Sequence, residues 1–400
     1  MIILSIETSC DETAVSIVEA KGGLTEPHFD VLGNALFSQI ATHAKYGGVF
    51  PMMAKREHAQ NLPHLLVTAL TEAKLYNKNQ ESKDGPWNEE KCGVMQKILE
   101  RENDLYEDLK NVLENVQKPE IDVIAVTAGP GLEPALWVGI SFAKALGVLW
   151  DIPVVPVNHM EGHITSVLLK TDERLMIHES RILNQKIQFP AVALLISGGH
   201  TELVEISDWG KYKIVGQTRD DAVGEAFDKV ARMLSLPYPG GPEISRLAEI
   251  ARTKNLPKVA KLPRPMIHSD NFDFSFSGLK TAVLYYIHDH GDLSEIDKED
   301  IAREFEDSVV DVLVEKTKMV LTETGAKTLI VAGGVISNKK LRESFEQMET
   351  ADLCVKIPGK NMATDNALMI ASACYINSLT NSSFISEKAE IVANGNLRLS

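Results

Sequence analysis

The chain has 400 residues, of which 44% are apolar and 24% charged, and this composition excludes a disordered, collagen-like or disulfide-stapled protein. Its 41 basic and 56 acidic residues leave a net charge of −15, so the whole molecule has no general attraction for nucleic acid or anionic membranes, and any RNA contact must be local. The four cysteines form no C-x-x-C pair, which fits a reducing compartment and excludes a cysteine-built zinc site.

The N-terminus passes directly into a strand pattern without a basic leader, so we expect no targeting segment and a cytoplasmic protein. The most apolar stretch, residues 136–150, contains Lys144 and two glycines and is shorter than the ~20 residues that span a bilayer. We therefore expect a buried helix there and no membrane contact.

Apolar runs rich in valine and isoleucine alternate along the chain with segments of helical spacing, which is typical of an α/β fold. The clearest strands are predicted at residues 2–6, 121–126, 153–157, 191–196 and 328–332. Most of them end in Gly, Ser, Thr or Asp. Because ligands of open α/β sheets lie beyond the carboxyl ends of the strands, the functional residues are expected at these ends.

The first predicted strand leads through a short polar turn into a second one, and residues 192–207 repeat this layout roughly 190 residues later. The repeat predicts a duplicated, two-lobed architecture in which each lobe offers a polar hairpin to a shared cleft. Gly198 and Gly199 in the second turn would let backbone N–H groups approach a phosphate closely. Two ordinary hairpins are the alternative.

Residues 77–118 look like an insertion in the N-terminal half of the chain. Their apolar side chains recur at helical spacing, and acids and lysines fill the other positions. The spacing is carried by Met95, Ile98, Leu99, Leu105, Leu109, Val112, Leu113 and Val116. We predict one amphipathic helix packed on the surface of the first lobe, with partner binding as the alternative role.

Two histidines, His159 and His163, stand four residues apart, which on a helix puts both imidazoles on one face as two ligands of one metal ion. Surface histidines also occur at this spacing, and that alternative stays open. In the metalloprotease motif H-E-x-x-H the Glu directly follows the first His, whereas Glu161 lies two residues after His159, about 200° round a helix. Peptide hydrolysis is therefore disfavoured.

The best donor of a third ligand is Asp365, which stands just before a run with helical spacing. Its alternative role is an N-cap of that helix. Two imidazoles and one carboxylate that leave open positions suit zinc or non-haem iron.

Three further segments could contact a nucleotide or a nucleic acid. Asp228 on one predicted helix and Gly241 before the next could hold a ribose, and the glycine pair at 333–334 follows a strand and precedes a helix. The alternatives are a solvated acid and ordinary turns. The stretch 251–265 is basic without an acid and is a candidate phosphate contact, although basic loops are often only solvated. Its cations are Arg252, Lys254, Lys258, Lys261 and Arg264.

Taken together, these motifs resemble the TsaD family of tRNA N6-adenosine threonylcarbamoyltransferases, formerly classed as O-sialoglycoprotein endopeptidases. They follow the family order over nearly the whole chain. The matching motifs are IETSCDET at 6–13, TAGPGL at 127–132, HMEGH at 159–163, SGGHT at 197–201, GEAFDK at 224–229, YPGG at 238–241, DFSFSGLKT at 273–281, AGGV at 332–335 and TDNALMIA at 364–371.

The resemblance implies a two-lobed actin/sugar-kinase/Hsp70-like (ASKHA) fold. We expect an N-terminal lobe at 1–156, with the insertion at 77–118 and completed by 360–400, and a C-terminal lobe at 157–359. Carried over by position, the metal ligands are His159, His163 and Asp365, and the candidate catalytic groups are Glu12 and Asp11. The substrate-binding positions are Leu195, Ile196, Ser197, Gly198, Gly199, Asp228, Gly241 and Asn338.

The reaction implied by the resemblance is transfer of the threonylcarbamoyl group from threonylcarbamoyl-AMP to N6 of the adenosine 3′ of the anticodon, in tRNAs reading codons that begin with A, with release of AMP. It implies one divalent metal ion, for which we expect iron rather than zinc, and TsaB-like and TsaE-like partner proteins beside tRNA. A metalloprotease and a non-catalytic nucleotide-binding scaffold are the alternative functions.

Overall fold

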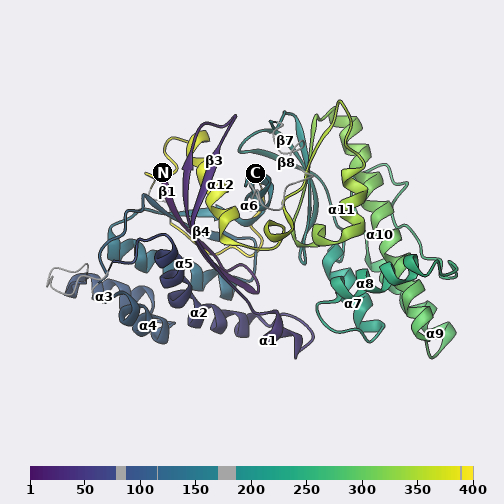
Figure 1. Ribbon diagram of the computed structural model, residues 1–400, viewed down its shortest axis with the longest axis horizontal. Helices are drawn as coiled ribbons and strands as arrows, with labels where there is room; N and C mark the ends of the chain where they lie inside the picture. The colour runs from purple at the N-terminus through teal and green to yellow at the C-terminus, as the bar shows by residue number, and fades with distance from the viewer. Residues whose placement is uncertain (78–86, 115, 170–185, 388–389, 400) are drawn as a thin grey trace. The chain divides into compact units, whose positions relative to one another are not determined.

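The computed structural model describes residues 1–77, 87–114, 116–169, 186–387 and 390–399 (Figure 1). The chain divides into two compact units. The first comprises Met1–Asp172 and Asp365–Leu399, and the second comprises Glu173–Thr364 and the final residue. Each unit contains one five-stranded sheet.

The sheet of the first unit has the strand order β3-β2-β1-β4-β5. Strands β1 and β2 and strands β2 and β3 pair antiparallel, whereas β4 pairs parallel with both β1 and β5. The strands are β1 (Ile2–Glu7), β2 (Glu12–Lys21), β3 (His28–Ser38), β4 (Val123–Gly129) and β5 (Val154–Asn158). The parallel pairing explains the continuous apolar run of β4, which is buried along its whole length.

The sheet of the second unit has the order β10-β9-β6-β7-β8 and repeats the same directions: two antiparallel pairs on one side of β6 and two parallel pairs on the other. Its strands are β6 (Ala191–Ile196), β7 (Thr201–Asp208), β8 (Lys211–Gln217), β9 (Thr328–Ala332) and β10 (Cys354–Lys356). The predicted ASKHA-like α/β fold with a duplicated core is confirmed by this repeated topology.

Helices cover both faces of the first sheet (Figure 1). Helices α2 (Pro51–Glu72) and α5 (Glu133–Trp150) pack on the face that carries Leu4 and Ile6, and α12 (Ala367–Thr380) packs against β1 and β2 from the opposite face. The short helices are α1 (Ile40–Ala44), α6 (His159–Thr165) and a 3-10 turn at Ser166–Leu168. The buried helix predicted at 136–150 is thus the body of α5. Within the described ranges no helix has both the length and the apolarity needed to cross a bilayer.

The described part of the insertion forms two helices, α3 (Glu89–Ile98) and α4 (Asn103–Leu113), so the prediction of one helix is wrong. Helix α3 packs against α5, and α4 packs against α2. The apolar spacing runs through the break because Leu99 and Leu105, on either side of it, are both buried in the same core. Residues 78–86 and 115 of the predicted insertion lie outside the described residues.

The second unit is helical outside its sheet. Its helices are α7 (Val223–Met233), α8 (Gly240–Thr253), α9 (Ser277–His290), α10 (Glu295–Thr324) and α11 (Lys339–Glu346), with 3-10 turns at Gly334–Ser337 and Lys360–Met362. The long helix α10 begins at a capping box of Ser294 and Asp297 and ends before Gly325, which adopts the left-handed conformation.

The boundary between the units differs from the one expected at residue 156. Helix α6 belongs to the first unit because it packs against α12 and follows directly on β5. The two histidines of α6 and Asp365 are therefore in the same unit.

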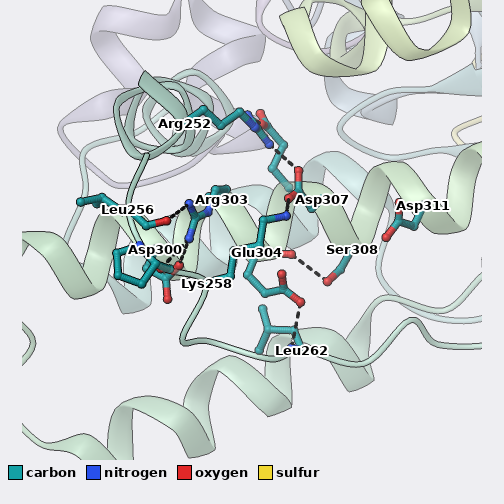
Figure 2. A network of polar contacts seen from close by, with 12 residues as sticks. Arg252, Leu256, Lys258, Leu262, Asp300, Arg303, Glu304, Asp307, Ser308 and Asp311 are labelled. Carbon is teal, nitrogen blue, oxygen red and sulfur yellow. Dashed lines mark hydrogen bonds and ion pairs between the residues drawn. The ribbon is translucent and has the colours of Figure 1, made fainter. Parts of the chain in front are cut away.

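The basic stretch at 251–265 lies along α10, whose acids pair with its cations (Figure 2). The ion pairs join Arg252 to Glu306 (2.5 Å) and Asp307 (2.6 Å), Lys254 to Glu299 (2.8 Å), Lys258 to Asp307 (3.1 Å), and Arg264 to Asp311 (3.0 Å) and Glu304. Acids forty or more residues away along the chain thus pair with four of the five cations, and a phosphate contact by this stretch stays a prediction.

Candidate active site

The two histidines are presented by α6, which starts where β5 ends. The Asn158 side chain caps this helix: its Oδ1 accepts hydrogen bonds from the backbone N–H of Met160 (2.9 Å) and Glu161 (3.4 Å). The helix places the rings of His159 and His163 edge to face, with centroids 4.7 Å apart. Both rings are buried, so the surface-histidine alternative is wrong.

Asp365 joins the histidines from the start of α12. Its Oδ1 lies 3.2 Å from Nε2 of His163 and 3.4 Å from Nε2 of His159. The N-cap role that was the alternative for Asp365 is filled by Asn366, whose side chain accepts from the N–H of Met369 (3.0 Å). The structure therefore brings the three predicted ligands together.

The donor atoms of His159, His163 and Asp365 all lie within 4.8 Å of one another. Nδ1 of the fully buried His163 lacks a hydrogen-bond partner among the residues that the structure describes, and the polar neighbour of its Nε2 is the Asp365 carboxylate. Leaving a buried polar atom unpaired costs about 1–3 kcal/mol, which a cation bound to the ring would offset. Two imidazoles and one carboxylate fit zinc or non-haem iron, so the residues present suit a divalent metal ion.

A fourth residue, Glu7 at the end of β1, holds the first histidine. Its Oε2 accepts from Nδ1 of His159 (3.1 Å) and from the hydroxyl of Thr127 (2.6 Å), and its Oε1 accepts from the N–H of Ser9 (2.6 Å). This contact at Nδ1 turns Nε2 toward Asp365. Glu7 was not among the predicted site residues, and the available signal was a carboxylate that ends a buried strand.

The charged groups of this cluster shift one another's pKa values. Burial would raise the pKa of Glu7 and of Asp365, but His159 beside them lowers both below their ordinary values. Burial would likewise lower the pKa of His159, whereas Asp365 and Glu7 raise it well above the usual value. Two carboxylates thus surround the imidazole and make the centre attractive to positive charge.

Replacing Glu7 with alanine is expected to weaken binding of a divalent cation by about 10- to 100-fold, because partners that orient a ligating histidine have effects of this size. Competition against a chromogenic chelator measures the change. Glu19→Ala is the matched control, since Glu19 lies at the far end of β2 and pairs with Lys21. An unchanged affinity in Glu7→Ala would show that Glu7 does not orient the ligand.

The candidate catalytic pair, Asp11 and Glu12, lies in the turn between β1 and β2. Burial, followed by the nearby charges of Asp11 and Asp365, raises the pKa of Glu12 to about 10. A backbone hydrogen bond holds this turn: the carbonyl of Asp11 accepts from the N–H of Gln39 (2.9 Å). Both predicted groups are therefore in the same unit as the three ligands, and Asp365 acts electrostatically on Glu12.

A chain of buried hydrogen bonds runs from the start of α2 to this turn. The N–H of Phe50 donates to Nδ1 of His43 (3.4 Å), and Nε2 of His43 donates to Oε1 of Gln39 (3.0 Å). Nε2 of Gln39 then donates to the hydroxyl of Thr13 (3.4 Å), which donates to Nδ1 of His58 (2.7 Å). Finally, Nε2 of His58 donates to the carbonyl of Cys10 (3.1 Å). The two ends assign the histidine tautomers, because a backbone N–H only donates and a carbonyl only accepts. Burial lowers the pKa of His58 to about 4, in agreement with a neutral ring.

Glu161, the acid between the two histidines that was compared with the general base of a metalloprotease, contacts α12. Its Oε2 accepts from Nδ2 of Asn377 on α12 (2.9 Å). This contact agrees with the sequence argument against peptide hydrolysis.

The predicted substrate-binding residues all lie in the second unit. Leu195 and Ile196 end β6, and the turn that follows is closed by the N–H of Ser197, which donates to the carbonyl of His200 (2.9 Å). At Gly198 and Gly199 no described atom other than those of chain neighbours lies within 4 Å of the place that a Cβ would take. The backbone of this turn is therefore open to a ligand.

Asp228 connects two helices of the second unit. Its Oδ1 accepts from the N–H of Gly240 (2.7 Å), the first residue of α8, and the neighbouring Gly241 has open space where a side chain would stand. Asn338 caps α11 through Leu341 N–H (2.9 Å) and donates from Nδ2 to Glu306 (2.6 Å). The amide of Asn338 thus already has a structural role, and its contact with substrate stays a prediction.

Packing requires a glycine at the first of the two glycine positions of the AGGV motif, Gly333. Gly333 has φ = +98°, and a Cβ there would lie 2.4 Å from the carbonyl oxygen of Ile196. Gly333 therefore lets the end of β9 approach the end of β6, while Gly334 is open at the same position.

Comparison with known proteins identifies the family. The model of the TsaD family, tRNA N6-adenosine threonylcarbamoyltransferase, matches residues 30–81 and 103–372. The chain belongs to the TsaD family. Curated TsaD relatives bear the same description: one from Paraburkholderia xenovorans is 40% identical over 93% of this chain and 91% of its own length, and one from Bacillus cereus is 41% identical over 93% and 90%. The predicted family and the predicted acyltransferase class are thereby confirmed.

Among solved structures, HypF of T. kodakarensis covers 70% of this TsaD chain and 44% of its own, with 12% identity and a TM-score of 0.48, a likeness too weak to carry an argument. The TsaD match includes the three metal-ligand candidates and all predicted substrate-binding positions. Residues 82–102, which contain α3, lie between the two matched ranges.

Proposed function

We propose that this TsaD chain transfers the threonylcarbamoyl group from threonylcarbamoyl-AMP to N6 of the adenosine 3′ of the anticodon, in tRNAs reading codons that begin with A. The observation that supports it is the buried cluster of His159, His163 and Asp365 in a chain of this family. In the step, N6 attacks the carbamoyl carbon and loses a proton, the carbon–oxygen bond to phosphate breaks, and AMP leaves. The substrate is already activated, so binding and orientation supply most of the catalysis.

His159, His163 and Asp365 would hold one divalent cation. When bound, this ion would supply Lewis-acid stabilisation of charge on the substrate. We propose iron rather than zinc, because two histidines and one carboxylate with open positions are typical of non-haem Fe(II) sites.

The residues of the second unit bind the acyl-nucleotide. Backbone N–H groups of Gly198 and Gly199 donate to its polar oxygens, and the open space at these glycines admits it. Ser197, whose own N–H closes the turn onto His200, positions the two glycines. Leu195 and Ile196 lead into this turn. Asp228, Gly241 and Asn338 are the positions proposed for its nucleoside end.

Asp11 and Glu12 are the proposed catalytic groups, with Asp11 as the acceptor of the N6 proton, because the raised pKa of Glu12 keeps that carboxyl protonated at neutral pH. An adenine amine is a weak nucleophile, so their contribution is smaller than that of orientation. We further propose that the protein works in the cytoplasm, with TsaB-like and TsaE-like proteins as partners beside tRNA.

The test combines purified chain, chemically prepared threonylcarbamoyl-AMP carrying labelled threonine, and tRNA reading an A-starting codon, with and without the two partner proteins. We expect label in tRNA and AMP in equal amounts, loss of both after chelation, and recovery with Fe²⁺. Label that stays out of tRNA in every combination would refute the transferase. Cleavage of a protein substrate would support the metalloprotease instead, and nucleotide binding without transfer would support the scaffold.

A further inference from the structure

The last described segment of the chain, residues 390–399, lies against the end of β4 and the start of α5, and we name it the C-terminal strap. The carbonyl of Ile391 accepts from Nζ of Lys144 on α5 (2.8 Å). Farther along, Asn394 N–H donates to the carbonyl of Ala128 in β4 (2.9 Å). The strap therefore crosses the carboxyl edge of the first sheet, where ligands of α/β folds bind.

The turn after β4 is shaped to receive the strap. Gly129 has φ = +146°, and a Cβ there would lie 1.9 Å from the carbonyl oxygen of Asn394. Two residues on, the N–H of Gly131 donates to the carbonyl of Gly395 (3.2 Å), and a Cβ on Gly395 would lie 2.8 Å from the carbonyl oxygen of Gly131. Glycines on both sides permit this close approach of two backbones.

Apolar side chains fix the strap on the unit. Ile391 and Ala393 are buried and belong to the same hydrophobic core as α2 and α5, and Leu399 is buried at the other end. The side chain of Val392 between them is 48% exposed. The strap is thus a packed part of the first unit along its described length.

The end of the strap reaches the helix that carries the histidines. Nδ2 of Asn158 donates to the backbone carbonyl of Arg398 (3.2 Å), while Oδ1 of the same amide caps α6. One side chain therefore joins the strap to the residue before His159. Because the amide has its donor on one side and its acceptor on the other, the two contacts together select one orientation of the group.

We propose that the C-terminal strap is a positioning element of the metal centre. Its hold on Asn158 fixes the first turn of α6 and thereby the directions in which His159 and His163 present their ring nitrogens. The inference rests on the metal site of the proposed function, and it assigns a role to residues beyond the end of the family match at 372.

The test measures Zn²⁺ affinity of the purified full chain and three variants by competition with a chromogenic chelator. A chain ending at Glu387 lacks the strap. Asn158→Ser keeps a good helix cap but cannot reach Arg398. Val392→Ala changes an exposed side chain of the strap and is the matched control.

We expect the shortened chain and Asn158→Ser to bind Zn²⁺ about 10- to 100-fold more weakly, the range for groups that orient metal ligands, and Val392→Ala to bind like the full chain. In the metal-free Asn158→Ser protein we expect faster hydrogen exchange at the amides of α6 with an unchanged unfolding temperature, which a general loss of stability would not give.

Unchanged affinity in Asn158→Ser would overturn the proposal even where the shortened chain fails to fold. A full chain that binds no Zn²⁺ or Fe²⁺ would overturn the metal site itself. That outcome differs from a full chain that binds metal regardless of the strap, which refutes only the positioning role.

Discussion

Replacing His159 or His163 with alanine is expected to remove the bound divalent cation and to lower the rate of tRNA threonylcarbamoylation by about 10³-fold or more. Each histidine is one of the three proposed ligands, and Lewis-acid stabilisation of several kcal/mol corresponds to this factor, since ~1.4 kcal/mol is tenfold in rate. Metal content by atomic absorption and initial rates with saturating threonylcarbamoyl-AMP measure the two effects.

The control for the histidine variants is His64→Ala, which removes an exposed imidazole from α2 and leaves the centre untouched. Both metal content and rate should stay at the level of the unmodified chain. If His163→Ala kept its metal and its rate, the unpaired Nδ1 of His163 would need another explanation and the metal-dependent reaction would be wrong.

Replacing Glu306 with alanine is expected to destabilise the second unit by about 1–3 kcal/mol, the cost of leaving buried polar groups without a partner. The Glu306 carboxylate is fully buried and accepts from the guanidinium of Arg252 (2.5 Å) and from Nδ2 of Asn338 (2.6 Å). Alanine would remove this acceptor from Nη1 of Arg252 and from the amide of Asn338, while Nη2 of Arg252 keeps its ion pair with Asp307. Urea unfolding followed by far-UV circular dichroism measures the loss.

Glu249→Ala serves as the comparison, because Glu249 pairs with Lys339 at the surface of the same unit. Exposed ion pairs contribute little, so its unfolding curve should overlay that of the unmodified chain. Equal unfolding midpoints for the Glu306 and Glu249 variants would mean that burial of Glu306 does not matter for stability.

The strands were predictable because parallel pairing buries both of their faces, and the sequence then shows continuous apolar runs. The insertion was predicted less well. Its apolar spacing continues through the break between Ile98 and Asn103, and only contacts with α2 and α5 decide that the chain turns there. The ion pairs of the basic stretch could not be predicted for a related reason: the acids that pair with Arg252 and Lys254 are on α10, which is distant in sequence.

In the candidate metal centre, some residues could be predicted from a local sequence pattern and others could not. The spacing of His159 and His163 on one helix is a local signal, and it was legible in the sequence. The local signal of Glu7 is only its place at the end of a buried strand, and the carboxylate acquires its role when β5 and α6 bring His159 to it. The roles proposed for Asp11, Glu12 and the substrate-binding residues depend on a ligand and stay predictions.

In the buried chain of hydrogen bonds between Phe50 and Cys10, those of His58 keep their directions over a wide pH range. His58 would gain a proton only near pH 4, far below physiological values, so in the cell it acts as a fixed dipole and not as a charge. Its partner Thr13 keeps the same hydrogen-bond role over that range. The hydrogen bond that His58 donates to the carbonyl of Cys10, next to Asp11 and Glu12 in the sequence, therefore keeps its direction at pH values well above 4.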